Sequence, residues 1–238
     1  MSNSSDSQIE EYSGINTQYV RHLKDALYDE ISFSGSYKSC CVGIVDAVNS
    51  TSTTAKLVNG KLCRYYSIFL NAMAVIVKEF GGIVIKNIGD SLLYYFPNTS
   101  DGVNRSAFID MLECSIAMIE SHTIINQRMY EENLPSVDYR ISIDYGNVMI
   151  ATSSNSLNED IFGSTVNLCA KMNSMAAPNS IVIGGDLHQI IKNFPGYNFN
   201  LIKGYSSGLK LDYPIYSILR SKTRKWFSRK QLKDIYFY

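Results

Sequence analysis

The stretch Phe80–Phe96, FGGIVIKNIGDSLLYYF, predicts a β-hairpin at the centre of the fold. Its two halves, Ile83–Ile85 and Leu92–Phe96, are β-branched, apolar or aromatic, as is typical of strands. Between them Asn87-Ile88-Gly89 supplies the turn, because Asn and Gly adopt positive φ at low cost. We therefore expect two short strands joined by a tight connection.

Lys86 and Asp90 place two charges at this turn. Charges within an apolar hairpin cost free energy unless they are paired, bound to a metal or open to a cleft. The pair is either a local salt bridge on a surface turn or part of a functional site, and the hairpin alone does not decide between them.

A second stretch, Cys40–Thr51, reads CCVGIVDAVNST. Cys40–Val45 is apolar or Gly throughout, as expected for a central strand buried on both faces. Asp46 follows at once, and Asn49-Ser50-Thr51 are good helix N-caps. A carboxylate at a strand end can hold a cation, and the neighbouring helix N-terminus can hold an anion. The alternative is that Asp46 is only a cap or a loop-end residue.

Four motifs follow one another along the chain: Asp46, then KNIGD at 86–90, RISIDYG at 140–146 and DIFGSTVNLCAKM at 160–172. In type, order and spacing they resemble class III nucleotidyl cyclases, the adenylate and guanylate cyclase catalytic domains. That family has a strand ending in Asp, a Lys-x-x-Gly-Asp hairpin, an Arg-apolar-x-apolar-x-x-Gly strand and an Asp-x-aromatic-Gly-x-x-Val-Asn helix start. The resemblance covers about residues 38–220.

The predicted elements run in the order βαββαβ with trailing elements, which suggests an α+β, ferredoxin-like sheet with helices on one side. The resemblance implies the same fold. Gly146-Asn147 predicts a hairpin turn between two strands. We expect a tail and helix over residues 1–35, the cyclase domain over 36–220 and a basic aromatic tail over 221–238.

The resemblance implies phosphoryl transfer assisted by two divalent metal ions, Mg²⁺ or Mn²⁺. The positions that match the family's metal ligands are Asp46, Asp90 and the backbone carbonyl of Ala47, all hard oxygen donors. The N–H groups around Asn49, Ser50 and Thr51 would hold the β- and γ-phosphates.

Further positions match the family's substrate contacts. Lys86 and Asp160 match the pair that reads a purine, and Asn167 matches the residue that orients the ribose. Lys171 stands where the family has an Arg that stabilises the transition state. Lys210 matches a late phosphate-binding Lys, for which Lys203 competes.

The sequence leaves two alternatives for the base of the nucleoside triphosphate. Lys86 and Asp160 favour ATP and cyclic AMP. Ser50 in place of the family's Phe, Lys171 in place of Arg and the lone-domain layout favour the pyrimidine cyclases of bacterial anti-phage defence, which make cyclic UMP or cyclic CMP. Lys cannot reproduce the planar fork of Arg, so the transition-state contact is altered.

In the family the metal aspartates and the base-reading residues come from opposite subunits. A chain that carries both sets implies a head-to-tail homodimer with two composite active sites. The alternative is a degenerate cyclase domain that binds nucleotide or mediates dimerisation. Lys171 supports that alternative, whereas the presence of both metal aspartates and Asn167 opposes it.

Composition limits the partners. Lys+Arg and Asp+Glu number 22 each, so bulk charge does not argue for nucleic acid or membrane. Seven Lys and Arg against one Asp make the tail at 220–238 basic, but a solvated or dimer-packing tail is favoured over a membrane-bound one.

The polar N-terminus is not a signal peptide, and five cysteines without metal spacing suit a reducing cytoplasm. The repeat of apolar residues predicts a helix over Glu10–Ile31. This helix would cover one face of the domain, pack against a second chain or receive a signal.

Overall fold

The computed structural model describes residues 36–152, 159–206 and 212–221. The expected N-terminal helix, Lys210 and the basic aromatic tail lie outside these ranges. No helix in the described part of the chain is long and apolar enough to span a bilayer.

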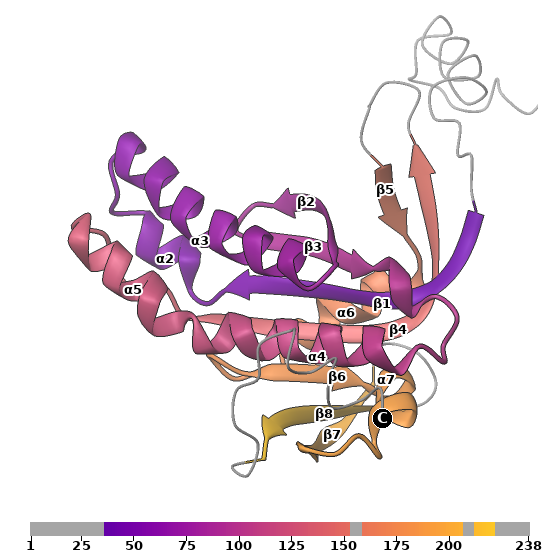
Figure 1. The fold of residues 1–238 in the computed structure, drawn as a ribbon. Coiled ribbons are helices and arrows are strands. Elements are labelled where there is room, and N and C mark those ends of the chain that lie inside the picture. The colour runs from indigo at the N-terminus through magenta and orange to yellow at the C-terminus, as the bar shows by residue number, and fades with distance from the viewer. Residues whose placement is uncertain (1–35, 153–158, 207–211, 222–238) are drawn as a thin grey trace, which may run out of the picture.

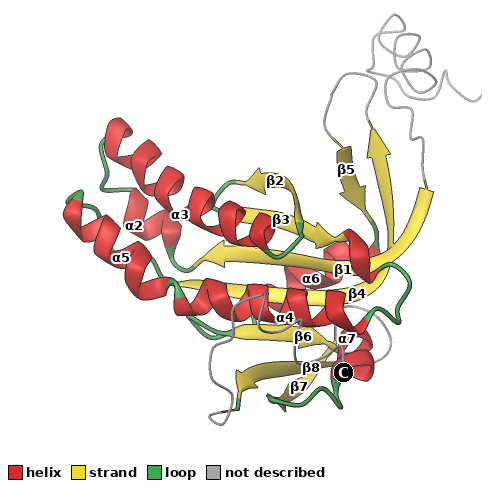
Figure 2. Cartoon of the chain, in the orientation of Figure 1, coloured by secondary structure: helices red, strands yellow, loops and turns green. Residues whose placement is uncertain are grey.

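The described strands form one mixed sheet (Figures 1 and 2). In chain order they are β1 Ser36–Ala47, β2 Ile83–Ile88, β3 Ser91–Phe96, β4 Tyr139–Thr152, β5 Glu159–Phe162, β6 Ile181–Gly184, β7 Tyr197–Ser206 and β8 Asp212–Arg220. Their order across the sheet is β2-β3-β1-β4-β6-β8-β7, and β5 pairs with β4 off this path. The helices are α2 Ser50–Thr54, α3 Asn59–Glu79, α4 Arg105–Glu120, α5 His122–Glu131, α6 Ser164–Asn173 and α7 Gly185–Ile191, with a 3₁₀ turn at Pro97–Thr99.

Strands β2, β3, β1 and β4, with the helices that connect them, form the ferredoxin-like βαββαβ unit, so the predicted α+β fold is confirmed. One face of the sheet is covered by α3, α4, α5 and α7, whose apolar side chains form the larger core. The expectation of helices on one side holds only for these four. Helix α6 packs on the opposite face, because Cys169 and Met172 bury a stripe against Val42, Ile44 and Val182.

Strand β1 is the buried centre of the sheet, as predicted. Cys41 and Val45 point into the larger core, while Val42 and Ile44 point toward α6. The β2–β3 hairpin is also confirmed. Its turn lies at Gly89-Asp90, with Gly89 at φ 62°, because Asn87 and Ile88 still pair with β3.

The hairpin turn predicted at Gly146-Asn147 is wrong. Strand β4 runs without a break from Tyr139 to Thr152, and Gly146 pairs with Cys40 of β1. A Cβ at Gly146 would lie 2.5 Å from the Thr165 hydroxyl oxygen. The glycine therefore permits the close approach of α6 to the sheet rather than a reversal of the chain.

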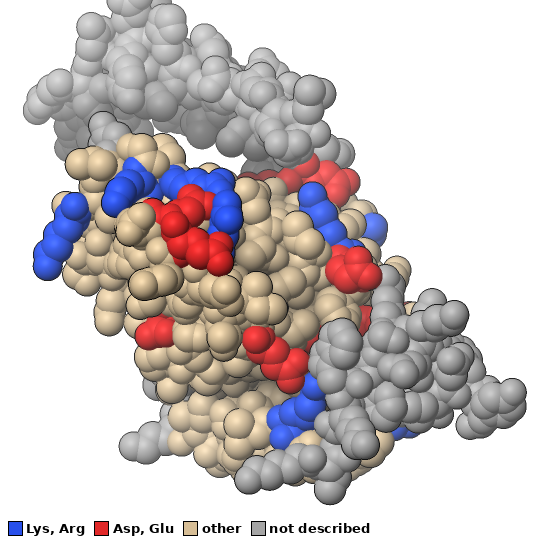
Figure 3. Space-filling model, turned by 60° about the vertical axis from the view of Figure 1, so that its left-hand side comes forward, with Lys and Arg blue, Asp and Glu red and all other residues tan. Residues whose placement is uncertain are grey.

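Charge is mixed over the described surface that Figure 3 presents, with Lys and Arg lying among Asp and Glu. On that face the described residues form no extended basic surface.

A buried carboxylate, Asp144, ties β4 to the start of α7 and to β8. It accepts hydrogen bonds from the backbone N–H of Tyr145 at 2.9 Å, from the backbone N–H of Leu187 at 3.3 Å and from the Tyr213 hydroxyl at 2.7 Å. Burial outweighs these bonds and raises the pKa of Asp144 to about 6.

The raised pKa of Asp144 makes the stability of the protein depend on pH. The unfolded chain ionises Asp144 near pH 4, so stability from this group is full below that pH and is lost as pH rises through 6. We expect the free energy of unfolding to fall by about 1 kcal/mol between pH 5 and pH 8 because of this group. Urea unfolding of wild type and Asp144→Asn between pH 5 and pH 8 measures this fall. An equal change of the free energy of unfolding with pH in the two proteins would refute the prediction.

Candidate active site

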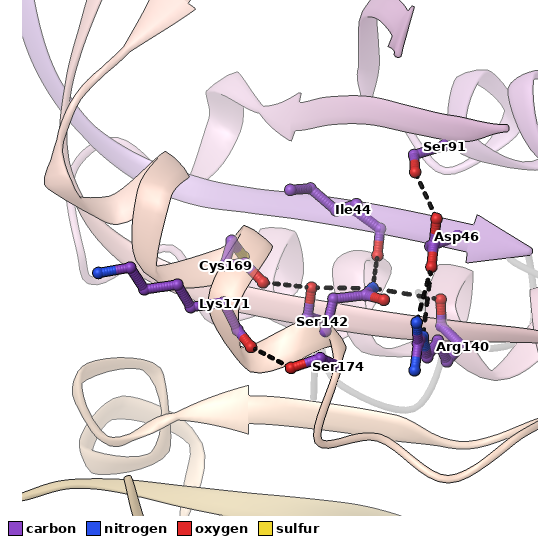
Figure 4. A network of polar contacts seen from close by, with 9 residues as sticks. Ile44, Asp46, Ser91, Arg140, Ser142, Cys169, Lys171 and Ser174 are labelled. Carbon is purple, nitrogen blue, oxygen red and sulfur yellow. Dashed lines mark hydrogen bonds and ion pairs between the residues drawn. The ribbon is translucent and has the colours of Figure 1, made fainter. Parts of the chain in front are cut away.

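Asp46 lies at the end of β1, between two neighbouring strands. It stands in register with Ser91 of β3 on one side and with Arg140 of β4 on the other. The Ser91 hydroxyl donates to Asp46 Oδ1 at 2.5 Å, and Arg140 Nη2 donates to Oδ2 at 3.1 Å (Figure 4). Both side chains of the ion pair are largely buried, at 25% exposure for Arg140 and 20% for Asp46.

Asp90 directly precedes Ser91 in the β2–β3 turn, so it lies at the same end of the sheet as Asp46. Strand β1, which contains Asp46, pairs with strand β3, which Asp90 precedes. Together with the backbone of Ala47 they present hard oxygen donors, which fit Mg²⁺ or Mn²⁺. No group of three His, Cys, Asp or Glu gathers anywhere in the described ranges. Such ions are commonly held by one or two carboxylates plus substrate phosphates and water, so two aspartates suffice.

A pocket of about 210 Å³ opens beside Asp46. Its lining comes from strands β1 to β4 and from the C-terminal end of α6 and consists of Ile44, Asp46, Ile88, Ser91, Leu93, Arg140, Ala170, Asn173 and Ser174. Apolar walls with a few polar groups are typical of a small-molecule site.

The predicted helix start after Asp46 is present, since α2 begins at Ser50. Asn49 occupies the N-cap position with φ 55°, but its side chain makes no capping hydrogen bond. Instead the Ser52 hydroxyl donates to the Asn49 carbonyl at 2.9 Å. The N–H groups of Ser50 and Thr51 open this short helix, which brings the expected phosphate-binding segment close to Asp46 in the chain.

Lys86 and Asp160 form an ion pair between β2 and β5, although 74 positions separate them in the sequence. The Lys86 ammonium also lies 6.0 Å from the centroid of the Phe162 ring. The two side chains are 44% and 31% exposed, so water weakens their attraction. An ion pair this open can exchange its internal hydrogen bond for bonds to a ligand.

Asn167 and Lys171 lie one turn apart on the exposed face of α6. Neither lines the pocket beside Asp46, to which α6 and its C-cap contribute Ala170, Asn173 and Ser174. Figure 4 shows the Lys171 amino group directed away from Asp46. Within one chain, the predicted ribose and transition-state groups therefore do not converge with the predicted metal ligands.

Arg140 and Asn173 are two site residues to which the sequence reasoning assigned no role. Arg140 belongs to the third motif and is paired with Asp46 across the sheet. The signal available was register: once β1 and β4 are paired, an arginine stands opposite the aspartate. A guanidinium at this position can hold phosphate oxygens in a fork.

Comparison with known proteins agrees with this arrangement. Residues 33–208 match the family model "Adenylate and Guanylate cyclase catalytic domain". A curated adenylate cyclase of Streptomyces coelicolor is 25% identical over 142 residues, which is 60% of this chain and 31% of that protein. The chain thus spans about a third of that relative's length.

Solved structures share the fold. The adenylyl cyclase CyaB from P. aeruginosa superposes with a TM-score of 0.73 at 20% identity, covering 82% of this chain and all of that one. The guanylyl cyclase Cya2 gives a TM-score of 0.67 at 19% identity, covering 77% and 93%. Because the family model spans most of the residues and the fold agrees, this chain belongs to the family of adenylate and guanylate cyclase catalytic domains.

Proposed function

We propose that this chain is a class III nucleotidyl cyclase, which converts a nucleoside triphosphate to a 3′,5′-cyclic nucleotide and pyrophosphate. The ribose 3′-oxygen forms a bond to the α-phosphorus, the bond from that phosphorus to the bridging oxygen breaks, and the 3′-hydroxyl proton is released. The observation that carries the proposal is the Lys86–Asp160 pair, which the fold assembles from distant segments. By motif, these two residues match the pair that contacts the base in this family.

The triphosphate would bind at the end of β1. Two divalent ions, Mg²⁺ or Mn²⁺, would be held by Asp46, Asp90 and the Ala47 carbonyl, and they supply activation of the 3′-hydroxyl and neutralisation of phosphate charge. The N–H groups around Asn49, Ser50 and Thr51 donate to the β- and γ-phosphates. Arg140, already beside Asp46, is a further phosphate ligand.

Asn167 orients the ribose in this proposal, and Lys171 stabilises the negative charge of the transition state. As a point charge, Lys171 neutralises that charge without the two parallel hydrogen bonds of an arginine. Lys210 would contact the phosphate chain.

A homodimer with two composite sites is part of this proposal, and the position of these groups supports it. Asn167 and Lys171 lie outside the pocket that contains Asp46, so a second chain would complete each site. Head-to-tail pairing of two copies places the α6 groups of one beside the aspartates of the other. A cytoplasmic location is part of the proposal, since the five cysteines are free and four are buried.

The base is proposed as either adenine or a pyrimidine. The intact Lys86–Asp160 pair supports ATP, whereas Ser50 and Lys171 support UTP or CTP and a signal in anti-phage defence. Purified protein incubated with Mn²⁺ and each of ATP, GTP, CTP and UTP, followed by mass identification of products, decides between them. Absence of product from all four would contradict the enzyme proposal.

Replacing the Lys86–Asp160 pair is expected to change base preference. In the double variant Lys86→Ala/Asp160→Ala, the ratio of kcat/KM between the preferred base and its nearest competitor should fall at least about tenfold, because hydrogen-bonding groups that discriminate bases are removed. The matched control is Arg64→Ala/Glu132→Ala, another surface ion pair, which should leave the ratio unchanged. An unaltered ratio in the first variant would remove the basis for base reading by this pair.

A second candidate is a degenerate cyclase domain that binds nucleotide or mediates dimerisation. The Lys at position 171 favours it, because the family's arginine fork is missing. Metal-dependent release of pyrophosphate separates the two candidates, since a binding module releases none.

A further inference from the structure

Asp46 already has a cationic partner in this structure. Arg140 donates to Asp46 Oδ2 through Nη2 at 3.1 Å and through Nε at 3.3 Å. A divalent metal ion on this carboxylate competes with the guanidinium, because two cations beside one carboxylate repel each other. A cation that binds Asp46 therefore weakens the attraction between Asp46 and Arg140.

The same pocket contains a buried acceptor that lacks a partner. Asn173 is 4% exposed, and its Nδ2 donates to the Ile44 carbonyl at 3.2 Å, the Arg140 carbonyl at 3.4 Å and the Ser142 hydroxyl at 3.2 Å. Those three acceptors fix the orientation of the amide. Its Oδ1 is buried, and no hydrogen bond reaches it from any described residue.

An unsatisfied buried acceptor is rare, and it destabilises the state that contains it. Arg140 and Asn173 line one pocket, and Arg140 has five N–H donors in a planar fork. If the Arg140 guanidinium leaves Asp46, it can donate one N–H to Asn173 Oδ1. Its other N–H groups can still donate to an anion.

We propose that Arg140 moves between two acceptors, Asp46 before a divalent cation binds and Asn173 Oδ1 afterwards, so that Asn173 is the residue that positions Arg140 for the triphosphate. The proposal rests on the metal role of Asp46 given above. In this arrangement cation binding releases the phosphate-binding arginine, so cation and nucleotide strengthen each other's binding by thermodynamic linkage.

The test measures Mn²⁺ affinity of the full chain without nucleotide, from the electron paramagnetic resonance signal of free Mn²⁺. Arg140→Gln removes the competitor and should tighten Mn²⁺ binding about fivefold. Asn173→Val removes the receiving oxygen and should weaken it about fivefold. In the double variant the Asn173→Val effect should vanish, because no guanidinium remains to be received.

Ser142→Ala is the matched control, since it perturbs the donor side of the Asn173 amide and leaves Oδ1 intact. It should leave Mn²⁺ affinity unchanged. A weakening by Asn173→Val that persists in the Arg140→Gln background would show a purely structural role and overturn the proposal. If Asn173→Val does not fold, unchanged affinity in Arg140→Gln alone overturns it.

Asp46→Ala separates this proposal from the proposed function. If Asp46→Ala binds Mn²⁺ as tightly as wild type, the metal role of Asp46 itself is wrong. If Asp46→Ala loses Mn²⁺ binding while Arg140→Gln equals wild type, only the transfer of Arg140 is wrong.

Discussion

Asp46→Asn is expected to slow cyclic nucleotide formation about a thousandfold while the chain still folds. A neutral amide keeps an oxygen for the Ser91 hydroxyl, so the strand end stays in place, but it loses the charge that would neutralise a divalent cation. Product formation with Mn²⁺, measured by mass, gives the loss, and circular dichroism confirms the fold. A variant that retains a tenth or more of wild-type activity would contradict the metal role of Asp46.

Mixing variants tests whether the sites are composite. Asp46→Asn and Asn167→Ala chains are each inactive, but a mixed dimer would carry one site with all its groups. With random pairing, half of the dimers are mixed and each has one intact site of two, so about a quarter of wild-type activity should return. Failure to recover activity, with mixed dimers demonstrated by mass, would exclude sites shared between subunits.

Arg220→Ala is expected to lower the free energy of unfolding by about 3–5 kcal/mol. Arg220, at the end of β8, forms an ion pair with Glu113 of α4, and the exposed fractions of the two side chains are 14% and 5%. The Tyr197 hydroxyl also donates to Glu113 at 2.5 Å. Truncating the arginine leaves a buried carboxylate without its cation, which costs more than the ion pair contributes. Urea unfolding followed by circular dichroism measures the loss.

Two further variants show whether the unpaired carboxylate of Glu113 causes the loss of stability in Arg220→Ala. Glu113→Gln combined with Arg220→Ala should recover more than half of the loss, because the buried group is then neutral. Arg128→Ala removes a surface arginine that pairs with Glu131 and Glu132 at 54% exposure, so it should cost under about 1 kcal/mol. Equal losses for the Arg128 and Arg220 variants would contradict the explanation.

Much of the fold follows from local pattern. The continuous apolar content of Cys40–Val45 and Leu92–Phe96 predicted the two central strands, and Asp46 was placed correctly at a strand end. Gly146 was misread because glycine is common both in turns and where a helix approaches closely, and only the position of Thr165 distinguishes these uses. The face on which α6 packs was missed for a similar reason, since an apolar stripe shows that a helix is buried but not against which side of the sheet.

The sequence by itself determined most of the elements, the ferredoxin-like order and the residue types of the four motifs, because apolar runs, turn chemistry and helix periodicity depend on neighbours in the chain. Only the tertiary structure decided the partners: Lys86 with Asp160, Arg140 with Asp46 and Arg220 with Glu113, separated by 74, 94 and 107 positions. Such pairs depend on strand order and register. These are set by the many small free energies of burying side chains across the whole sheet. The packing of α6 on the sheet also directs Lys171 away from Asp46. That direction is the structural reason for proposing a second chain.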